Sequence, residues 1–487
     1  MKTDILRTID DWARRTPDRV AHRSGSRRLT YAELCQRSDT LAAHLVRTLP
    51  DDGSPVAVCG HKEPETLIAF LAAVKAGHPY VPIDSVLPQQ RVARTVAAAG
   101  CRLTLTPETI ATLVNRAAPA PDYRLGPADP YYIMFTSGST GEPKGVVITL
   151  GCLISFLEWM VAQHSFEEGE TFLNQVSYAF DVSVMDTYTA LLTGGTVFSI
   201  TKDDVNNPKQ LYQSLRASGV TTWVSTPSFA GMCLAERSFA AGMLPRVRRF
   251  LFCGEVLPRE VAAELLDRFP NAEVWNTYGP TETTVATTSM RIDREILARY
   301  SRLPIGHPMP GTRVVVVDEG GRTLEPGKRG EIVIAGPNVS PGYLGRPDLT
   351  ARAFSELDGM RAYHTGDWGY YQDGLLFCDG RMDNQIKLHG YRVELGDVEA
   401  NLRGVAGIRD VVVLPILRND RPESLAAFVI LSERLPGSDF EVSRTLRTRL
   451  AERLPAYMLP RQFFFLETFP MTANGKTDRR KLAALQG

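Results

Sequence analysis

The stretch Tyr131-Tyr132-Ile133-Met134-Phe135-Thr136-Ser137-Gly138-Ser139-Thr140-Gly141-Glu142-Pro143-Lys144-Gly145 says most about the fold, because a short apolar strand runs directly into a loop rich in glycine and hydroxyls. Glycine lets backbone N–H groups turn inward without Cβ clashes, and the hydroxyls and the Lys144 ammonium can reach phosphate oxygens. Nucleotide sites usually lie at strand ends of this kind. The spacing is not that of the P-loop. Taken by itself the loop has a second interpretation, a mobile surface segment, but the rest of the chain favours a phosphate-binding loop.

The size and charge of the chain exclude several classes of protein. Its 487 residues are too many for a single core, and roughly three units of ordinary domain size are expected. Lys plus Arg and Asp plus Glu both number 55, so nothing favours a nucleic-acid partner. Seven scattered cysteines without a C-x-x-C pair argue against disulfides and zinc. No secretory signal is found, and the longest apolar run, Leu67 to Val74, is too short for a membrane span. A cytoplasmic protein without membrane insertion is expected.

Apolar strands alternate with helical patterns from about residue 8 to residue 290, which predicts parallel sheets with helices on both faces. From about 303 to 382, strands separated by Gly- and Pro-rich turns predict a small antiparallel β-barrel. Past Arg381 the pattern is mixed again. The expected fold class is α/β, with a large N-terminal core over 1–382 followed by a small, mobile α+β C-terminal domain over 383–487. The core consists of two parallel-sheet α/β subdomains to about 300 and the β-barrel at about 303–382.

Four further motifs carry residue types suited to nucleotide chemistry. They are Asn276-Thr277-Tyr278-Gly279-Pro280-Thr281-Glu282, Tyr363-His364-Thr365-Gly366-Asp367, Gly380-Arg381-Met382-Asp383-Asn384-Gln385-Ile386-Lys387 and Pro470-Met471-Thr472-Ala473-Asn474-Gly475-Lys476. The first places a turn and the Glu282 carboxylate after the strand candidate Glu273–Trp275, where Mg²⁺ could bind. Asp367, expected in a tight turn, could accept both hydroxyls of a ribose. Each motif also has an ordinary interpretation, such as a turn-capping Asp367 or a solvated tail lysine at Lys476.

In order and spacing, these motifs resemble the adenylate-forming superfamily of peptide-synthetase adenylation domains, acyl-CoA synthetases and luciferases. The resemblance begins at Leu29-Thr30-Tyr31-Ala32-Glu33-Leu34, continues through Lys75-Ala76-Gly77 and Tyr80-Val81-Pro82-Ile83-Asp84, and ends at Lys476. It implies ATP as a substrate, with the Gly-rich loop on the β- and γ-phosphates and Mg²⁺ on Glu282. It also implies that Asp367 takes the ribose with Arg381 nearby, and that Tyr278 stacks near adenine.

The resemblance assigns a catalytic and a nucleotide-binding set of residues. The catalytic set is Lys476, Thr136, Lys144 and Glu282. The nucleotide-binding set is Thr136, Ser137, Gly138, Ser139, Thr140, Gly141, Lys144, Gly254, Glu255, Asn276, Thr277, Tyr278, Gly279, Thr281, Asp367, Arg381 and Lys476. Lys476 would bridge the substrate carboxylate and the α-phosphate, because a cation touching both lowers the barrier to attack by about 3–5 kcal/mol.

The segment Phe180-Asp181-Val182-Ser183-Val184-Met185-Asp186 resembles the amino-acid-activating branch, in which the first Asp pairs with the substrate α-ammonium. The pocket assigned in this way is Asp181, Val182, Met185, Val224, Leu251, Cys253, Thr277, Val285 and Ala286. Its uncharged, medium or bulky side chains predict a small apolar substrate side chain. The segments Ser225-Thr226-Pro227-Ser228-Phe229 and Leu251-Phe252-Cys253-Gly254-Glu255-Val256-Leu257-Pro258 are most similar to stand-alone D-alanine–carrier protein ligases, in which the matching cysteine lies against the alanyl methyl. Alanine is expected as the substrate, and the residues leave its handedness open.

The implied acceptor is a separate carrier protein that bears phosphopantetheine, and the enzyme is expected to be a monomer. A carrier thiol and Lys476 cannot use the same face at once, so the C-terminal domain should swing about a hinge at Asp383. In the second pose Gly390 would give the pantetheine arm room.

Two other functions stay open at this point. An acyl- or aryl-CoA ligase shares the fold, but it has no ammonium for Asp181 to neutralise and a carboxylate there would only be costly to desolvate. A non-catalytic nucleotide-binding relative is the other alternative, and the presence of Lys144, Glu282, Asp367 and Lys476 argues against it.

Overall fold

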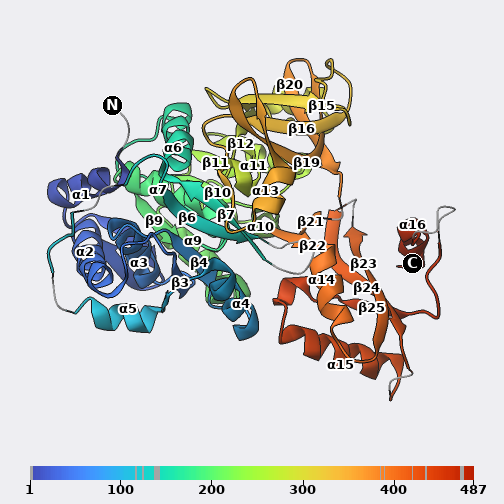
Figure 1. Cartoon of the computed structure of the whole chain (residues 1–487). Helices are drawn as coiled ribbons and strands as arrows, with labels where there is room; N and C mark the ends of the chain where they lie inside the picture. Colours follow the sequence, from blue (N-terminus) through green and yellow to red (C-terminus); the bar gives the residue numbers. More distant parts are fainter. Residues whose placement is uncertain are drawn as a thin grey trace. The chain divides into compact units, whose positions relative to one another are not determined.

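The structure is a computed structural model that describes residues 4–115, 118–122, 125–136, 143–383, 385–388, 390–418, 421–433, 436–471 and 477–486 (Figure 1). Its residues fall into two compact units, which are described separately. The first comprises 1–85, 99–135 and 145–382, and the second 86–98, 136–144 and 383–487. Among the described helices, none has both the length and the apolar character needed to cross a bilayer.

The first unit contains a nine-stranded sheet in which neighbouring strands from β12 to β1 are parallel. In spatial order its strands are β14 (His307–Pro308), β13 (Thr288–Ile292), β12 (Glu273–Tyr278), β11 (Arg249–Phe252), β10 (Thr222–Ser225), β8 (Thr171–Asn174), β9 (Thr196–Ser199), β1 (Val20–Ser24) and β2 (Arg27–Thr30). The strands β13, β14 and β2 run antiparallel to their neighbours at the two ends.

A second sheet of six strands has the order β17 (Gly342–Tyr343), β7 (Lys144–Thr149), β6 (Pro130–Thr136), β4 (Tyr80–Asp84), β3 (Val56–Gly60) and β5 (Leu103–Leu105). Its strands β3, β4, β5 and β6 are joined by parallel pairs. The helices that accompany the two sheets are α1 (Ile5–Arg15), α2 (Tyr31–Thr48), α3 (Pro64–Lys75), α5 (Pro107–Leu113), α6 (Leu150–His164), α7 (Val182–Leu192), α8 (Lys202–Asn206), α9 (Pro208–Ser218), α10 (Pro227–Leu234), α11 (Arg259–Arg268) and α12 (Arg294–Arg299).

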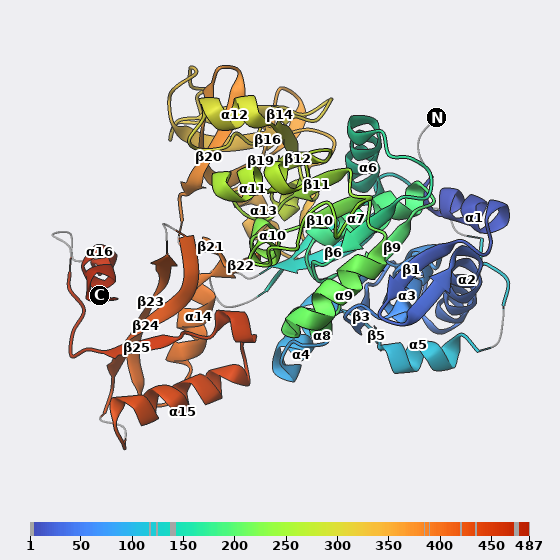
Figure 2. The same ribbon diagram turned by 180° about the vertical axis from the view of Figure 1, so that it is seen from behind.

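Side-chain alternation along β10 and β11 decides which face of the nine-stranded sheet meets which helices. Val224 and Leu251 join the large core cluster that also contains Met185 of α7. Trp223 and Phe250, one position away on each strand, join a separate cluster with residues of α9, α10 and α11. Because successive side chains of a strand point to opposite faces, the sheet is covered on both sides (Figure 2).

An antiparallel five-stranded sheet completes the first unit. It contains β15 (Arg313–Val317), β16 (Gly330–Ala335), β19 (Met360–Gln372), β18 (Phe354–Leu357) and β20 (Leu375–Arg381), and β19 pairs with β16, β18 and β20. The short helix α13 (Pro347–Ala353) precedes β18, and the 3₁₀ turn η1 (Thr281–Thr283) follows β12.

The second unit has its own core around a three-stranded sheet. Its elements are α4 (Gln89–Ala99, grouped here up to residue 98), β21 (Gln385–Leu388), β22 (Tyr391–Glu394), α14 (Leu395–Arg403), β23 (Ile408–Arg418), β24 (Arg421–Leu431), α15 (Asp439–Ala451), η2 (Ala456–Met458), β25 (Gln462–Phe465), α16 (Arg479–Ala483) and η3 (Ala484–Gln486). Val398 and Leu402 of α14 and Leu450 of α15 pack on one face of β23 and β24, while Leu482 of α16 packs on the other.

The predicted α/β class, with parallel sheets and a smaller antiparallel part, is confirmed. Two local expectations are wrong. The strand predicted to end at Trp275 continues to Tyr278, so the turn of this motif comes later, at residues 280–283. Asp367 does not lie in a tight turn but inside β19, where the register with β20 shifts between Asp367 and Gly369. A strand irregularity accommodates the Thr-Gly-Asp composition that otherwise suggests a turn.

Candidate active site

The candidate site lies where three adjacent parallel strands end. The strands β10, β11 and β12 are paired in order, so their carboxyl ends lie at one edge of the sheet, which is where ligands bind in open α/β sheets. The segments that follow them are the ones singled out in the sequence. Thr226 follows β10, Cys253–Glu255 follow β11, and Gly279–Glu282 follow β12.

The structure places the predicted acyl-pocket residues in one buried region of the first unit. Val182, Met185, Val224, Leu251, Cys253, Val285 and Ala286 all belong to the same core cluster. Thr277 is also buried, and its hydroxyl donates to the Phe252 carbonyl at 2.8 Å. Asp181, at the start of α7, is only 9% exposed, so its carboxylate lies at the margin of an otherwise apolar region.

The backbone of Val285, which is predicted to form a wall of the acyl pocket, is unusual. Thr284 and Val285 have φ values of 59° and 67°, in the left-handed region that a β-branched residue rarely adopts. The amide of Ala286 donates to the Thr284 carbonyl at 2.8 Å, which closes a strained γ-turn around Val285. The Cys253 thiol donates to the Val285 carbonyl at 3.5 Å and ties this wall to the end of β11. Nearby, a Cβ at Gly279 would lie 2.6 Å from the Ala286 Cα, so only glycine fits there.

A second cluster joins β12 to β19. The Tyr278 hydroxyl donates to Asp367 Oδ2 at 2.5 Å, and Arg381 Nη1 donates to Asp367 Oδ1 at 3.0 Å and to the Thr365 carbonyl at 2.7 Å. Burial, followed by the negative charge of Asp367, raises the pKa of Tyr278 well above its ordinary value, so the phenol remains a donor. Three of the predicted nucleotide residues are therefore in direct contact.

The backbone beside Asp367 is held by a histidine–carboxylate pair. His364 Nδ1 lies 3.0 Å from Glu331 Oε2, and Glu331 Oε1 accepts from the Gly366 amide at 2.9 Å. The hydrogen bond to Glu331 raises the pKa of His364 above its ordinary value. His364 therefore has a structural role beside the motif.

Glu282 is completely buried in η1, and its Oε1 accepts a hydrogen bond from the Tyr343 hydroxyl at 2.8 Å. Within the described residues no cluster of three or more His, Cys, Asp or Glu could hold a metal ion. A single carboxylate does suit Mg²⁺ that arrives with a nucleotide, because this ion takes one or two carboxylates and fills its shell with phosphate oxygens and water. The donor set present fits the predicted ion.

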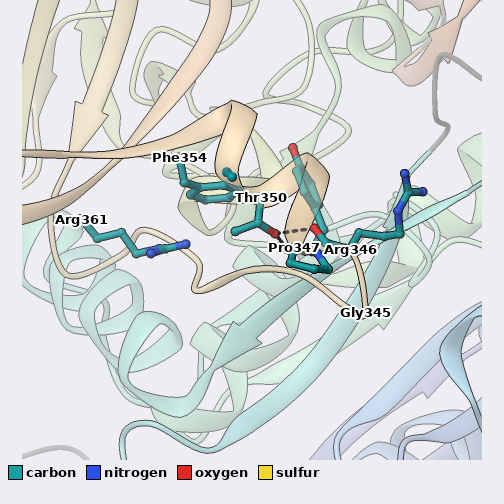
Figure 3. A pocket seen from close by; sticks show the side chains of 8 residues that line it. Gly345, Arg346, Pro347, Thr350, Phe354 and Arg361 are labelled. Atoms are coloured by element: carbon teal, nitrogen blue, oxygen red, sulfur yellow. Dashed lines mark hydrogen bonds between the residues drawn. The ribbon is translucent and has the colours of Figure 1, made fainter.

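Tyr343 also belongs to the lining of a pocket of about 430 Å³ (Figure 3). It is lined by Tyr343, Gly345, Arg346, Pro347, Thr350, Ala351, Phe354 and Arg361. Both arginines are engaged, Arg346 by Asp348 and Arg361 by the carbonyls of Ser340 and Pro341. The pocket contains no residue that the sequence assigned to the site.

The remaining predicted nucleotide residues have individual settings. Gly254 has a φ of 90°, and Glu255 Oε2 accepts from the Ser228 amide at 2.9 Å. The Asn276 side chain donates to the Pro304 carbonyl at 2.8 Å, and Thr281 is buried in η1.

Several predicted residues are not brought into these clusters. Thr136 ends β6 and Lys144 begins β7, and both are grouped with the second unit. The Thr136 hydroxyl is buried and has no hydrogen-bond partner among the described residues. Ser137, Gly138, Ser139, Thr140, Gly141 and Lys476 lie outside the described residues. In the second unit, Asp383 Oδ1 accepts from the Gln385 amide at 3.1 Å, and Gly390, with a φ of 84°, lies in the turn between β21 and β22.

Two features of the site, one hydrogen bond and one backbone conformation, were not predicted from the sequence. Tyr343, which holds Glu282, comes from a Pro-Gly-Tyr stretch that carries no chemical signal, 61 residues away. The positive φ of Val285 also has no sequence signal, because valine is among the residues least suited to it.

Known proteins match this chain over nearly its whole length. Residues 9–344 match the model of the AMP-binding enzyme family, and residues 397–476 match that of the AMP-binding enzyme C-terminal domain. The chain therefore belongs to the family of AMP-binding enzymes. It is 45% identical over 496 residues to the D-alanine--D-alanyl carrier protein ligase of Bacillus cereus (strain G9842), a match that covers 98% of each protein. The predicted class, an adenylate-forming ligase, is confirmed.

Solved structures share the fold. The adenylation domain AlmE of Vibrio cholerae, in complex with glycyl-adenosine-5'-phosphate, superposes with a TM-score of 0.87 at 20% identity over 100% of this chain and 98% of that one. An artificially fused adenylation–PCP di-domain from Klebsiella oxytoca, NpsA-ThdA, gives a TM-score of 0.82 at 26% identity over 95% of this chain and 94% of that chain.

Proposed function

We propose that this enzyme uses ATP to adenylate alanine and transfers the alanyl group to the phosphopantetheine thiol of a separate carrier protein. The observation that carries the proposal is the 45% identity, over 98% of the chain, to a D-alanine--D-alanyl carrier protein ligase, which supports alanine as the substrate and a carrier as the acceptor. The Asp181 carboxylate, 9% exposed at the start of α7, would offer a negative charge to the α-ammonium of an amino acid.

The size of the substrate follows from the pocket walls. Met185, Leu251 and Cys253 are at most 1% exposed, and the Cys253 thiol contacts the Val285 carbonyl, so these predicted walls are tightly buried together. A methyl side chain suits such walls, whereas one additional methylene in a closed apolar pocket reduces reactivity by ~10–200-fold.

For the nucleotide, the contacts support the roles implied by the family. Asp367, oriented by Tyr278 and Arg381, would accept the ribose hydroxyls. The buried hydroxyl of Thr136, which has no hydrogen-bond partner within the described part of the chain, suits a phosphate oxygen, and Lys144 and the loop 137–143 would supply further donors. Glu282 would hold Mg²⁺, which neutralises the charge on the leaving pyrophosphate when it is bound.

For the acyl transfer, we extend the proposal to a movement of residues 383–487 about Asp383. Lys476 would serve the adenylation pose by bridging the substrate carboxylate and the α-phosphate, and Gly390 would accommodate the pantetheine arm in the thiolation pose. A monomer acting in the cytoplasm fits this scheme. The transfer can be tested by incubating the purified enzyme with ATP, alanine and a phosphopantetheinylated carrier. The mass of the carrier should then increase by that of one alanyl group.

The decisive measurement is ATP–pyrophosphate exchange with D-alanine, L-alanine, glycine, serine and β-alanine. We expect one enantiomer of alanine to give the highest kcat/KM, and the same experiment assigns its handedness. A preference for fatty or aromatic acids with CoA-dependent AMP release would favour the acyl-CoA ligase instead. No exchange with any acid, at intact nucleotide binding, would favour the non-catalytic alternative.

Asp181→Asn tests the ammonium contact separately. Removing one partner of a buried ion pair costs about 3–5 kcal/mol, so kcat/KM for alanine should fall by at least ~10²-fold. Propionate, which has the same methyl group but no ammonium, is the matched control substrate, and its poor reactivity should not fall further. An unchanged KM for alanine would mean that another group holds the amine.

A further inference from the structure

The strained turn at Val285 is held by residues far away in the sequence. Asn338, in the segment between β16 and β17, is completely buried. Its Nδ2 donates to the Thr283 carbonyl at 2.8 Å and to Thr287 Oγ1 at 2.9 Å. Its own carbonyl accepts from Thr284 Oγ1 at 2.7 Å. Asn338 is therefore hydrogen-bonded to the chain on both sides of Val285.

Two further contacts fix Asn338 itself. Its Oδ1 accepts from Thr312 Oγ1 at 2.9 Å, so both ends of the side-chain amide are hydrogen-bonded. Two residues on, the Ser340 amide donates to the Glu282 carbonyl at 2.9 Å. The segment 338–340 thus runs along 282–287, and Thr312 holds it from the side away from that segment's hydrogen bonds.

Such contacts are what a strained backbone requires. A β-branched residue with positive φ persists only where surrounding hydrogen bonds over-determine its conformation, and such residues gather at functional sites. Without the bonds to Asn338, the segment 283–287 would relax toward negative φ. Val285 would then move, and with it the carbonyl that accepts from Cys253.

We propose that Asn338 is a positioning residue that sets the depth of the acyl pocket by holding Val285 in its left-handed turn, and so determines the discrimination against side chains larger than methyl. This inference rests on the proposed function, because it takes Val285 as part of the pocket wall. Asn338 would not touch the substrate. It would act only through the backbone of 283–287.

The test compares alanine with 2-aminobutyrate, which is one methylene larger, in ATP–pyrophosphate exchange. The readout is the ratio of their kcat/KM values. Asn338→Ala should lower this ratio by ~10-fold or more, since methyl-sized discrimination in an apolar pocket spans this range. The ratio is the readout because a general loss of structure would affect alanine and 2-aminobutyrate alike. The KM for ATP should stay within about twofold. Asn401→Ala is the matched control: it removes another buried side-chain amide, one that donates to Asp397 in the second unit, and should keep the ratio close to that of the unmodified enzyme.

Val285→Gly supplies the second arm, because glycine adopts positive φ without strain. Alone it should lower the ratio by removing the wall. In the Val285→Gly background, Asn338→Ala should have little additional effect on the ratio, a non-additivity that an independent structural role would not produce. If Asn338→Ala does not fold, Thr284→Ala removes one of the bonds, and Thr284→Ser, which retains the hydroxyl, should restore the ratio.

The outcomes distinguish a failure of the inference about Asn338 from a failure of the proposed acyl pocket. If Val285→Gly changes the ratio and Asn338→Ala or Thr284→Ala leaves it unaltered, the inference is wrong while the pocket stands. If Val285→Gly itself leaves the ratio unaltered, the pocket assignment in the proposed function is wrong, and the inference is overturned with it. Additive effects of Val285→Gly and Asn338→Ala would also overturn it.

Discussion

Tyr278→Phe isolates a single buried contact in the candidate nucleotide site. The substitution removes the hydroxyl that donates to Asp367 Oδ2 at 2.5 Å and leaves the ring in place. Both residues are buried, so no bulk water replaces the lost donor. Asp367 keeps Arg381 as a partner through its other oxygen, at 3.0 Å.

The magnitude follows from the type of bond. A hydrogen bond to a charged group contributes about 1.5–3 kcal/mol, and the raised pKa of Tyr278 keeps the proton on the phenol at neutral pH. If Asp367 binds the ribose, losing this orientation should raise the KM for ATP by ~10–150-fold, with a much smaller change in the KM for alanine. ATP titrations in the pyrophosphate-exchange assay measure both constants.

Tyr300→Phe is the matched control. Its hydroxyl also donates to a carboxylate, Asp373 Oδ2, at 2.8 Å, but neither residue belongs to the candidate site. This variant should change the melting temperature slightly and leave both KM values alone. A Tyr278→Phe enzyme that folds normally and keeps its KM for ATP would refute the assignment of Asp367 to the ribose.

Three further predictions concern other parts of the molecule. Lys476→Ala should slow adenylation by ~10²–10⁴-fold while sparing thioester formation from preformed alanyl-AMP, and near-normal pyrophosphate exchange would contradict its role. Asp383→Pro should impair the thiolation half-reaction far more than adenylation, because proline restricts φ at the expected hinge, and an equal loss in both halves would contradict the two-pose scheme. Burial lowers the pKa of His22 and His164 from 6.5 to about 3, so the unfolded chain binds protons that the folded chain does not. The free energy of unfolding should therefore be highest above pH 6.5 and fall by about 2 kcal/mol per imidazole at pH 5; urea titrations of His164→Leu should show a shallower fall, and an unchanged slope would count against the buried neutral imidazole.

Much of this protein was predictable from local sequence. The alternation of apolar strands and helical patterns predicted the α/β class, because burial imposes a period on each element that neighbouring residues alone reveal. The ordered motifs from Thr136 to Lys476 predicted the family that the comparisons confirm.

Tertiary structure alone decided how the functional side chains are held. Tyr278 and Asp367 are 89 residues apart, and their contact depends on how β12 meets β19, which no local pattern encodes. Asp367 was misplaced in a turn for a related reason, since pairing with β20 extends the strand through a composition typical of turns. Val285 is the clearest case. Its intrinsic preference opposes the conformation it adopts, and only hydrogen bonds from a distant segment overcome that preference.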